Sequence, residues 1–289
     1  MERTLYECHG HIMMDGADFA AARTRHRDGA DEAAVRAALS ALREAGVEYF
    51  RDGGDALGVS LLARQLAPEY GVEYVTPAFA IHRRGYYGGI VGRAYGDLEE
   101  YRLRLTEARD AGCDFIKLIL SGILTFRDDE PLSCPALPPD EIAALIAIAH
   151  GEGFAVMAHV NGAESVRAAI EAGADSIEHG YWMDAECLEK LAVSQTVWVP
   201  TLAAVAAFIG RDGFERAAVE NVLRHQRENV RHALALGALV ATGSDAGAFG
   251  VPHGEGAKRE YSLLKESGAA AERLSRANRL LRERFRRKE

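Results

Sequence analysis

The sequence predicts an α/β protein folded as an eight-stranded (β/α)8 TIM barrel. Apolar runs typical of buried strands alternate with segments of helical periodicity along the whole 289-residue chain. There are eight such runs, and eight parallel strands is the number that closes into a barrel. The competing architecture, an open doubly wound sheet, lacks its G-x-G-x-x-G signature after the first strand. No linker or break in composition divides the chain, so we expect one domain over residues 1–289.

The same alternation gives the position of each element. Several expected helices are followed by a glycine, as is common just after a helix C-terminus. Strands are expected at residues 5–12, 47–52, 73–81, 115–121, 155–160, 176–179, 197–202 and 239–245. Helices are expected at residues 31–45, 58–69, 97–110, 139–151, 162–172, 184–192 and 214–236, with two more at 254–267 and 269–287.

Composition narrows the classes of partner and compartment. The net charge of −9 argues against a nucleic-acid partner, because phosphate binding needs a positive surface. The longest apolar run, residues 142–149, is too short to cross a bilayer, so no membrane partner is expected. Four scattered cysteines without a C-x-x-C pair, and an N-terminus without an apolar leader segment, indicate a cytoplasmic protein.

Two histidines one residue apart, His9 and His11, are the most informative feature of the sequence. On a strand, side chains at i and i+2 point to the same face, so the two imidazoles converge. His159 and His179 end two further apolar runs, and Asp245 ends another. Alone, such a histidine is more often a buried core residue, and Asp245 alone fits a helix N-cap or a turn. Because all of them occupy strands of one predicted barrel, a metal centre is the leading hypothesis.

Lys117 lies inside an apolar strand, and its neighbours on both sides are apolar. An unpaired buried ammonium is costly, so an isolated lysine here would be expected to pair with a carboxylate. Beside the histidines we favour a ligand role, in which CO2 converts the amine into a carbamate that bridges two cations. Asp245 could contact a metal and also accept a proton from metal-activated water.

This series of residues resembles the amidohydrolase superfamily. The resemblance comprises His-x-His on strand one, lysine on strand four, histidines on strands five and six, and aspartate on strand eight. It covers nearly the whole chain. The flanking residues resemble the imidazolonepropionase-like and Xaa-Pro dipeptidase-like branch at positions 50–54, 172–180, 199–202, 243–247 and 252–254.

The resemblance implies a binuclear centre of two divalent metal ions, with zinc the expected metal. A metal-bridging hydroxide would attack the amide-type carbonyl of a small dipeptide-like, N-acyl or cyclic amide substrate. Asp245 would act first as general base and then as general acid. The implied ligands are His9, His11 and Asp245 for one ion and His159 and His179 for the other, with carboxylated Lys117 bridging both.

Three features depart from the family pattern. Glu7 stands where the family usually has aspartate before His-x-His. Asn161 replaces a second histidine common in the dipeptidase-like branch. The accessory β-sandwich that many relatives build from both termini is not expected, since strand one begins near residue 5 and little sequence follows strand eight.

The expected substrate contacts are His82, at the end of strand three, and Asn161. Arg83 and Arg84 could bind a substrate carboxylate, although charged loops are usually just solvated. Tyr181 and Trp182 could wall the pocket or merely pack against a loop.

Other functions fit the same residues. A lactonase could use the same centre, because the attack on the carbonyl is identical. A mononuclear deaminase would keep Lys117 uncarboxylated, and a non-catalytic barrel would bind a small molecule without turnover. A homo-oligomer is compatible with the sequence.

Overall fold

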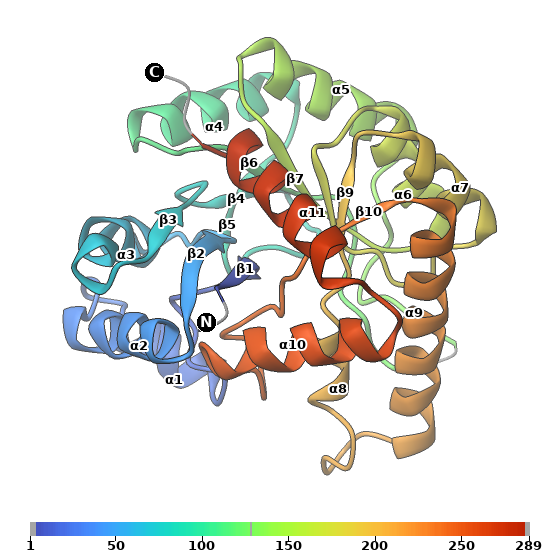
Figure 1. Cartoon of the computed structure of the whole chain (residues 1–289). Coiled ribbons are helices and arrows are strands. Elements are labelled where there is room, and N and C mark those ends of the chain that lie inside the picture. Colours follow the sequence, from blue (N-terminus) through green and yellow to red (C-terminus); the bar gives the residue numbers. More distant parts are fainter. Residues whose placement is uncertain (1–3, 128, 287–289) are drawn as a thin grey trace.

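Ten short strands form the centre of the fold, and helices lie around them (Figure 1). These elements belong to a computed structural model that describes residues 4–127 and 129–286. Each pairing between the named strands is parallel. The predicted α/β class with a parallel sheet is therefore confirmed.

The strands form two hydrogen-bonded sheets. The smaller sheet has the order β1-β2-β3, with β1 at Leu5–Gly10, β2 at Val47–Asp52 and β3 at Glu73–Val75. The larger sheet has the order β10-β9-β8-β7-β6-β4-β5. Its strands are β4 (Ala80–Arg83), β5 (Gly92–Tyr95), β6 (Ile116–Ile119), β7 (Val156–Val160), β8 (Ser176–His179), β9 (Val197–Val199) and β10 (Leu239–Val240).

The backbone links the two sheets on both sides. On one side, the chain runs directly from β3, which pairs with β2, into β4, which pairs with β6. The predicted strand 73–81 is thus two strands, interrupted where Ala78 takes a φ of 64°. On the other side, β1 bonds to the segment after β10. The Cys8 N–H donates to the Thr242 carbonyl at 2.9 Å, and the Asp245 N–H donates to the His9 carbonyl at 2.8 Å.

The helices follow the predicted alternation, and all nine predicted helices are present. Local sequence explains their ends: the Asp31 side chain caps α2, and Gly237, with a φ of 96°, ends α9. The helices are α2 (Glu32–Glu44), α3 (Val59–Leu66, followed by a 3-10 turn at Ala67–Tyr70), α4 (Leu98–Asp110), α5 (Pro139–Gly151), α6 (Ala163–Glu171), α7 (Ala185–Val193), α9 (Arg216–Leu236), α10 (Glu255–Glu266) and α11 (Ala271–Arg284). The predicted end of the last helix, at residue 287, lies outside the described residues.

The sequence prediction missed three short elements and extended several strands too far, two of them by three residues or more. The missed elements are α1 (Phe19–Arg25), α8 (Leu202–Ala206) and β5. The predicted strand 197–202 ends at Val199, because Thr201 has a left-handed φ of 49° and α8 begins after it. The predicted strand 239–245 keeps regular strand geometry only at its first two residues.

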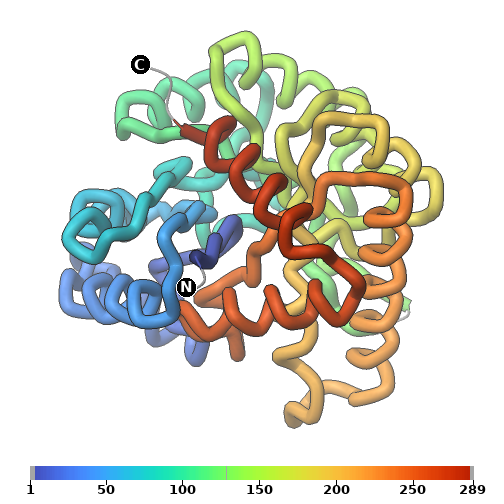
Figure 2. Tube along the Cα trace, viewed as in Figure 1, coloured from blue at the N-terminus to red at the C-terminus, as the bar shows by residue number. Residues whose placement is uncertain are grey.

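Helix α11 covers the amino-terminal end of the strands. Phe285 packs edge-on against Phe115, just before β6, with 5.0 Å between ring centroids. Leu281 and Phe285 share one buried cluster with Val197, the first residue of β9. Figure 2 shows the chain of α11 crossing this part of the molecule. The opposite, carboxyl-terminal end of the strands is left for the cavity described below. In residues 4–127 and 129–286, no helix has the length and apolar character that a membrane crossing requires.

Candidate metal centre

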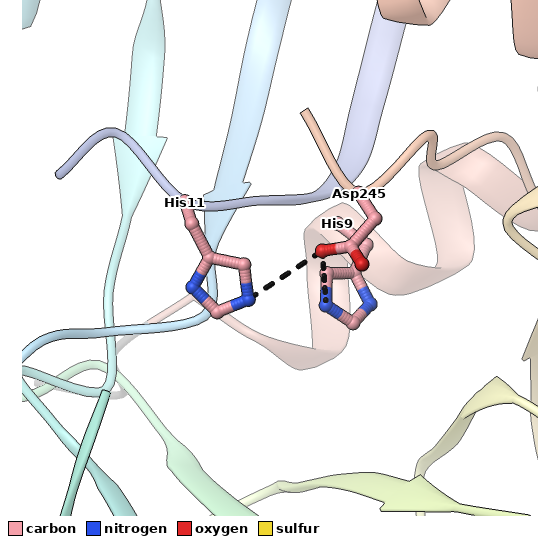
Figure 3. Close-up of side chains that lie close together, drawn as sticks. All are labelled: His9, His11 and Asp245. Atoms are coloured by element: carbon pink, nitrogen blue, oxygen red, sulfur yellow. Dashed lines mark ion pairs between the residues drawn. The ribbon is translucent and has the colours of Figure 1, made fainter. Parts of the chain in front are cut away.

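His9, His11 and Asp245 form a compact group of possible metal ligands (Figure 3). His9 and His11 come from β1 and the residue that follows it, and Asp245 comes from the segment after β10. The Asp245 Oδ1 atom lies 3.5 Å from Nε2 of His9 and 3.6 Å from Nε2 of His11. One ligand atom from each residue lies within 4.8 Å of the others. The three residues can therefore share one cation.

Lys117, His159 and His179 lie beside this group. The Lys117 Nζ atom is 3.1 Å from Nε2 of His9. The His179 ring lies 4.8 Å from the His9 ring and 4.6 Å from the His159 ring, centroid to centroid. The structure thus gathers all six predicted ligand residues in one place. Their roles as ligands stay a prediction.

The backbone around the centre is unusual at several points. A Cβ atom at Gly53 would lie 2.1 Å from the His11 ring, so only glycine leaves room for that imidazole. His179 and Asp245 both adopt left-handed backbone conformations, with φ of 65° and 62°. Such conformations are costly for residues other than glycine, and they concentrate at functional sites.

A buried carboxylate orients His9. The Glu178 Oε2 atom lies 2.7 Å from His9 Nδ1, and Arg51 Nη2 donates to Glu178 Oε1 at 2.8 Å. Arg51 also donates to the Cys8 carbonyl at 2.7 Å and to the Ser176 hydroxyl at 2.8 Å. The tautomer follows from these contacts: Nδ1 of His9 donates to the carboxylate, and Nε2 keeps its lone pair toward the cluster. Partners of this kind fix the orientation of metal-binding histidines.

His159 and His179 also have defined partners. Nδ1 of His179 lies 2.8 Å from the Thr201 hydroxyl, which in turn is 2.9 Å from the Tyr181 hydroxyl. Nε2 of His159 lies 3.3 Å from the Gly122 carbonyl oxygen, which accepts if that nitrogen carries the proton. Each ring therefore has one nitrogen engaged with the protein and one available for another partner.

Burial keeps the four histidines neutral. Desolvation, reinforced by the positive Lys117, lowers the pKa of His11 and of His159 to about 3. Desolvation likewise lowers the pKa of His9 and of His179 well below the usual value. Neutral imidazole is the form that binds metals.

The chemistry of the donor atoms fits a divalent metal ion. With Nδ1 of His9 donating to its carboxylate partner, the lone pair on Nε2 faces both an Asp245 oxygen and the Lys117 ammonium, so a positive charge between the two acceptors is favourable. Burial raises the pKa of Asp245 to about 6 and Lys117 opposes that rise, while 19% of the side chain remains exposed. Burial lowers the pKa of Lys117 to about 8. Two nitrogens and one carboxylate oxygen are ligands typical of zinc and other first-row metals.

A cavity of about 560 Å³ opens over this centre. That volume suits a small-molecule ligand. Asn161 and Tyr181 lie on its wall, and the Asn161 side-chain amide donates to the Gly122 carbonyl at 3.1 Å. Five of the predicted metal ligands also line it: His11, Lys117, His159, His179 and Asp245.

Four other residues considered as substrate contacts do not line the cavity. His82 is not among the residues that line the cavity; its Nδ1 lies 3.0 Å from the Arg83 carbonyl oxygen. Arg83 pairs with Glu141 at 2.5 Å and Arg84 pairs with Glu100 at 2.6 Å, so both arginines are held by surface carboxylates. The Trp182 ring packs 5.3 Å from the His225 ring. The substrate role of His82 stays a prediction that the cavity does not support.

Sequence reasoning missed Glu178, Arg51 and Thr201. Strand alternation places Glu178 and His179 on opposite faces, but the left-handed backbone of His179 brings both toward the centre. The available signal was a charged residue inside an otherwise buried strand. Arg51 and Glu178 both have that character, and both are fully buried.

Residues 4–285 match the Amidohydrolase family, and this chain therefore belongs to that family. The predicted resemblance is confirmed. The chain is 30% identical to ochratoxinase from Aspergillus niger over 131 residues, which are 45% of this chain and 27% of that protein. It is 30% identical to an uncharacterized protein of Mycobacterium tuberculosis (strain ATCC 25618 / H37Rv) over 149 residues, 50% of this chain and 40% of that protein. These matches span less than half the length of either relative.

Solved structures with the same fold include enzymes of the dipeptidase-like branch. A Xaa-Pro dipeptidase with methionine bound in its active site superposes with a TM-score of 0.78 and 24% identity, over 96% of this chain and 75% of that one. Ochratoxinase from A. niger superposes with a TM-score of 0.76 and 20% identity, over 98% of this chain and 71% of that one.

Proposed function

We propose that this chain is a metal-dependent hydrolase that cleaves an amide-type C–N bond in a small molecule. The observation that carries the proposal is the approach of His9, His11 and Asp245 to one another beside one cavity, which His11 and Asp245 line. Membership of the Amidohydrolase family supports it. Similarity to an ochratoxinase and to a Xaa-Pro dipeptidase also supports it.

The proposed centre holds two divalent ions, with zinc the expected metal. When bound, the ions would supply Lewis acidity that activates water and polarises the substrate carbonyl. The second ion needs a donor besides His159 and His179, and Lys117, carboxylated by CO2, would supply an anionic oxygen. The proposed ligands are His9, His11 and Asp245 for one ion, His159 and His179 for the other, and Lys117 for both.

The protein's own groups would perform the proton transfers. Asp245 faces the cavity and would accept a proton from the attacking water and return it to the departing nitrogen. Glu178 would hold His9 in the tautomer that directs Nε2 to the centre. Asn161 and Tyr181, on the wall beside the centre, would contact the substrate.

We also infer that the strands close into an eight-stranded barrel. The continuous chain from β3 into β4, and the hydrogen bonds from β1 to the segment after β10, support closure on both sides. The predicted absence of an accessory β-sandwich, the single domain, the cytoplasmic location, the lack of a nucleic-acid partner and the homo-oligomer stay predictions.

The test is hydrolysis by purified, metal-analysed protein supplied with bicarbonate. N-acyl amino acids, dipeptides, cyclic amides and lactones would be compared, with product release followed by chromatography. Amide cleavage that chelation removes and zinc restores is the expected result. Preferred lactone cleavage would make the protein a lactonase, and absence of turnover with tight ligand binding would make it a binding protein.

One observation favours a centre with a single ion. Among the described residues, His9, His11 and Asp245 are the group in which three possible ligand residues lie within reach of one another, whereas His159 and His179 lack a third. This arrangement suits a mononuclear deaminase with uncarboxylated Lys117. For the proposed two-ion centre, we expect two metal equivalents per chain. We also expect ¹³C NMR to detect a carbamate on Lys117 after ¹³CO2 labelling. One equivalent without the carbamate would favour the mononuclear centre.

A further inference from the structure

The cavity wall above the metal centre is apolar, and we propose that it selects amides whose two flanking groups are apolar and uncharged, over amides that carry a free carboxylate. This selectivity rests on the proposed amide hydrolysis and specifies its substrate class. It differs from the dipeptide-like substrate that the family resemblance implies, because a dipeptide ends in a carboxylate.

Apolar side chains form most of the wall. Ile90, Ile123, Leu124 and Val205 line it together with Phe19 and four further phenylalanines. Among the described lining residues, formal charge comes only from Lys117 and Asp245, apart from the histidines, and all of these belong to the metal centre. A substrate carboxylate on this wall would therefore meet no cation among the lining residues outside the centre, and burying an unpaired charge is costly.

The four phenylalanines, Phe126, Phe208, Phe214 and Phe249, form an aromatic cluster. Ring centroids are 4.6 Å apart for Phe208 and Phe214, 5.1 Å for Phe126 and Phe208, and 5.7 Å for Phe208 and Phe249. They come from three loops: Phe126 from the loop after β6, Phe208 and Phe214 from the loop between α8 and α9, and Phe249 from the loop after Asp245. Separate loops thus contribute to one surface suited to stack against an aromatic or aliphatic group.

Part of this apolar surface is open to solvent. Among the described residues, seven large apolar side chains are exposed, and three of them line this cavity: Ile123 (38% exposed), Phe214 (36%) and Phe249 (43%). Exposed apolar groups that gather at one cavity mark a binding surface, whereas scattered ones need no explanation.

Polar groups on the wall do not provide a carboxylate site. The Ser133 hydroxyl oxygen accepts the Ile123 N–H at 3.1 Å, and the Thr125 hydroxyl donates to the Glu130 carbonyl. Arg211 lies over the Phe249 ring, 3.9 Å from its centroid, and is not among the residues that line the cavity.

Tyr87 offers the wall a free neutral group. Within the described part of the chain its hydroxyl has no hydrogen bond, while its ring lies 5.5 Å from that of His159. A neutral donor next to the centre suits an amide carbonyl oxygen.

The test uses two compounds that differ only in one carboxylate: N-benzoylphenethylamine and N-benzoylphenylalanine. Benzoate release by the zinc-loaded protein gives kcat/KM, and calorimetric titration of the chelator-treated full chain gives binding without turnover. We expect kcat/KM and affinity to favour the neutral compound by about 100-fold or more. Equal values, or a preference for the carboxylate, would overturn the proposed selectivity. So would failure of the protein to bind the neutral compound.

Two variants connect the preference to the wall. Phe249→Ala should weaken binding of the neutral compound roughly 10-fold. Leu98→Ala, on the surface of α4, is the matched control because both side chains are 43% exposed, and it should change nothing. Phe214→Arg should improve binding of the carboxylate compound roughly 10-fold. Circular dichroism and melting curves confirm folding of each variant. Unchanged binding in folded Phe249→Ala and Phe214→Arg would contradict the proposal.

The two proposals fail separately. Selective binding of the neutral compound without benzoate release would uphold the selectivity and count against amide hydrolysis. Cleavage of both compounds at equal rates would uphold hydrolysis and count against the selectivity.

Discussion

The two ends of the strands contrast in structure and in chemistry. At the amino end, α11 closes the fold with apolar contacts such as the edge-on pair of Phe115 and Phe285. At the carboxyl end, two predicted ligands have left-handed backbones, and an open cavity lies over neutral histidines. The same strands therefore carry an apolar plug, formed by α11, at one end and a strained, polar site at the other. In α/β barrels generally, the carboxyl ends of the strands carry the active site and the amino ends serve stability.

The largest effect is expected for Asp245→Asn, at the carboxyl end of the strands. Since this carboxylate would transfer the proton, we expect kcat to fall by about 10²–10⁴-fold. The melting temperature should change little, because the side chain is partly exposed and makes no contact with the plug. Initial rates and thermal melts measure both. Unchanged turnover would remove Asp245 from the mechanism.

Leu281→Ala probes the opposite end. Leu281 is fully buried in α11, so the free energy of unfolding should fall by about 2–5 kcal/mol. Activity per folded molecule should stay the same, because the residue lies in the cluster at the amino end. Urea denaturation and active-site titration separate the two quantities. A loss of kcat in the folded fraction would show that the ends are coupled through packing.

Glu178→Gln tests a residue that connects the interior to the metal centre. Replacing the carboxylate weakens its hold on Nδ1 of His9, and we expect metal affinity to fall by about 10–100-fold. Competition with a chromophoric chelator measures it. Glu141→Gln is a suitable control, since Glu141 pairs with Arg83 away from the cavity. Equal affinity in Glu178→Gln and wild type would reduce the carboxylate to a packing role.

The smallest expected effect is on the pH dependence of stability. It arises because a buried titratable group also lies at the carboxyl end. Glu260 in α10 accepts the Ala203 N–H at 2.7 Å, and burial raises its pKa from 4.5 to about 8. Between those values the folded protein keeps a proton that the unfolded chain releases, so stability falls as pH rises through that range. Glu260→Gln should flatten this dependence by a few degrees of melting temperature. Melts of wild type, Glu260→Gln and the exposed control Glu266→Gln, taken at pH 6 and pH 9, would show it. A parallel dependence in all three would rule out Glu260 as its source.

Much of the fold could be predicted because its signal is periodic. Apolar runs of strand length separated by amphipathic helices gave the order of elements, and the nine longer helices are where the sequence places them. Short elements carry too few residues to show a period. β5 has four residues, none of them in an apolar run, and α8 has five.

The candidate site divides in the same way. His9, His11, Lys117, His159, His179 and Asp245 could be found because each is a polar residue in or at the end of an apolar strand. The wall could not, since an apolar residue in a loop, such as Phe126 or Phe214, gives no hint of which surface it joins. The substrate role of His82 stays a prediction: its place on a strand suggested the contact, and it is not among the residues that line the cavity.

One side chain, Arg51, connects the two ends of the strands. The guanidinium of Arg51 rests 4.3 Å from the centroid of the Phe285 ring and, through Glu178, steers an imidazole of the centre. If a protease cleaved the end of the last helix and removed the Phe285 ring, we therefore expect the proposed centre to bind metal ions more weakly. Preparations of this protein should be checked for an intact C-terminus before their affinities for a metal ion are compared.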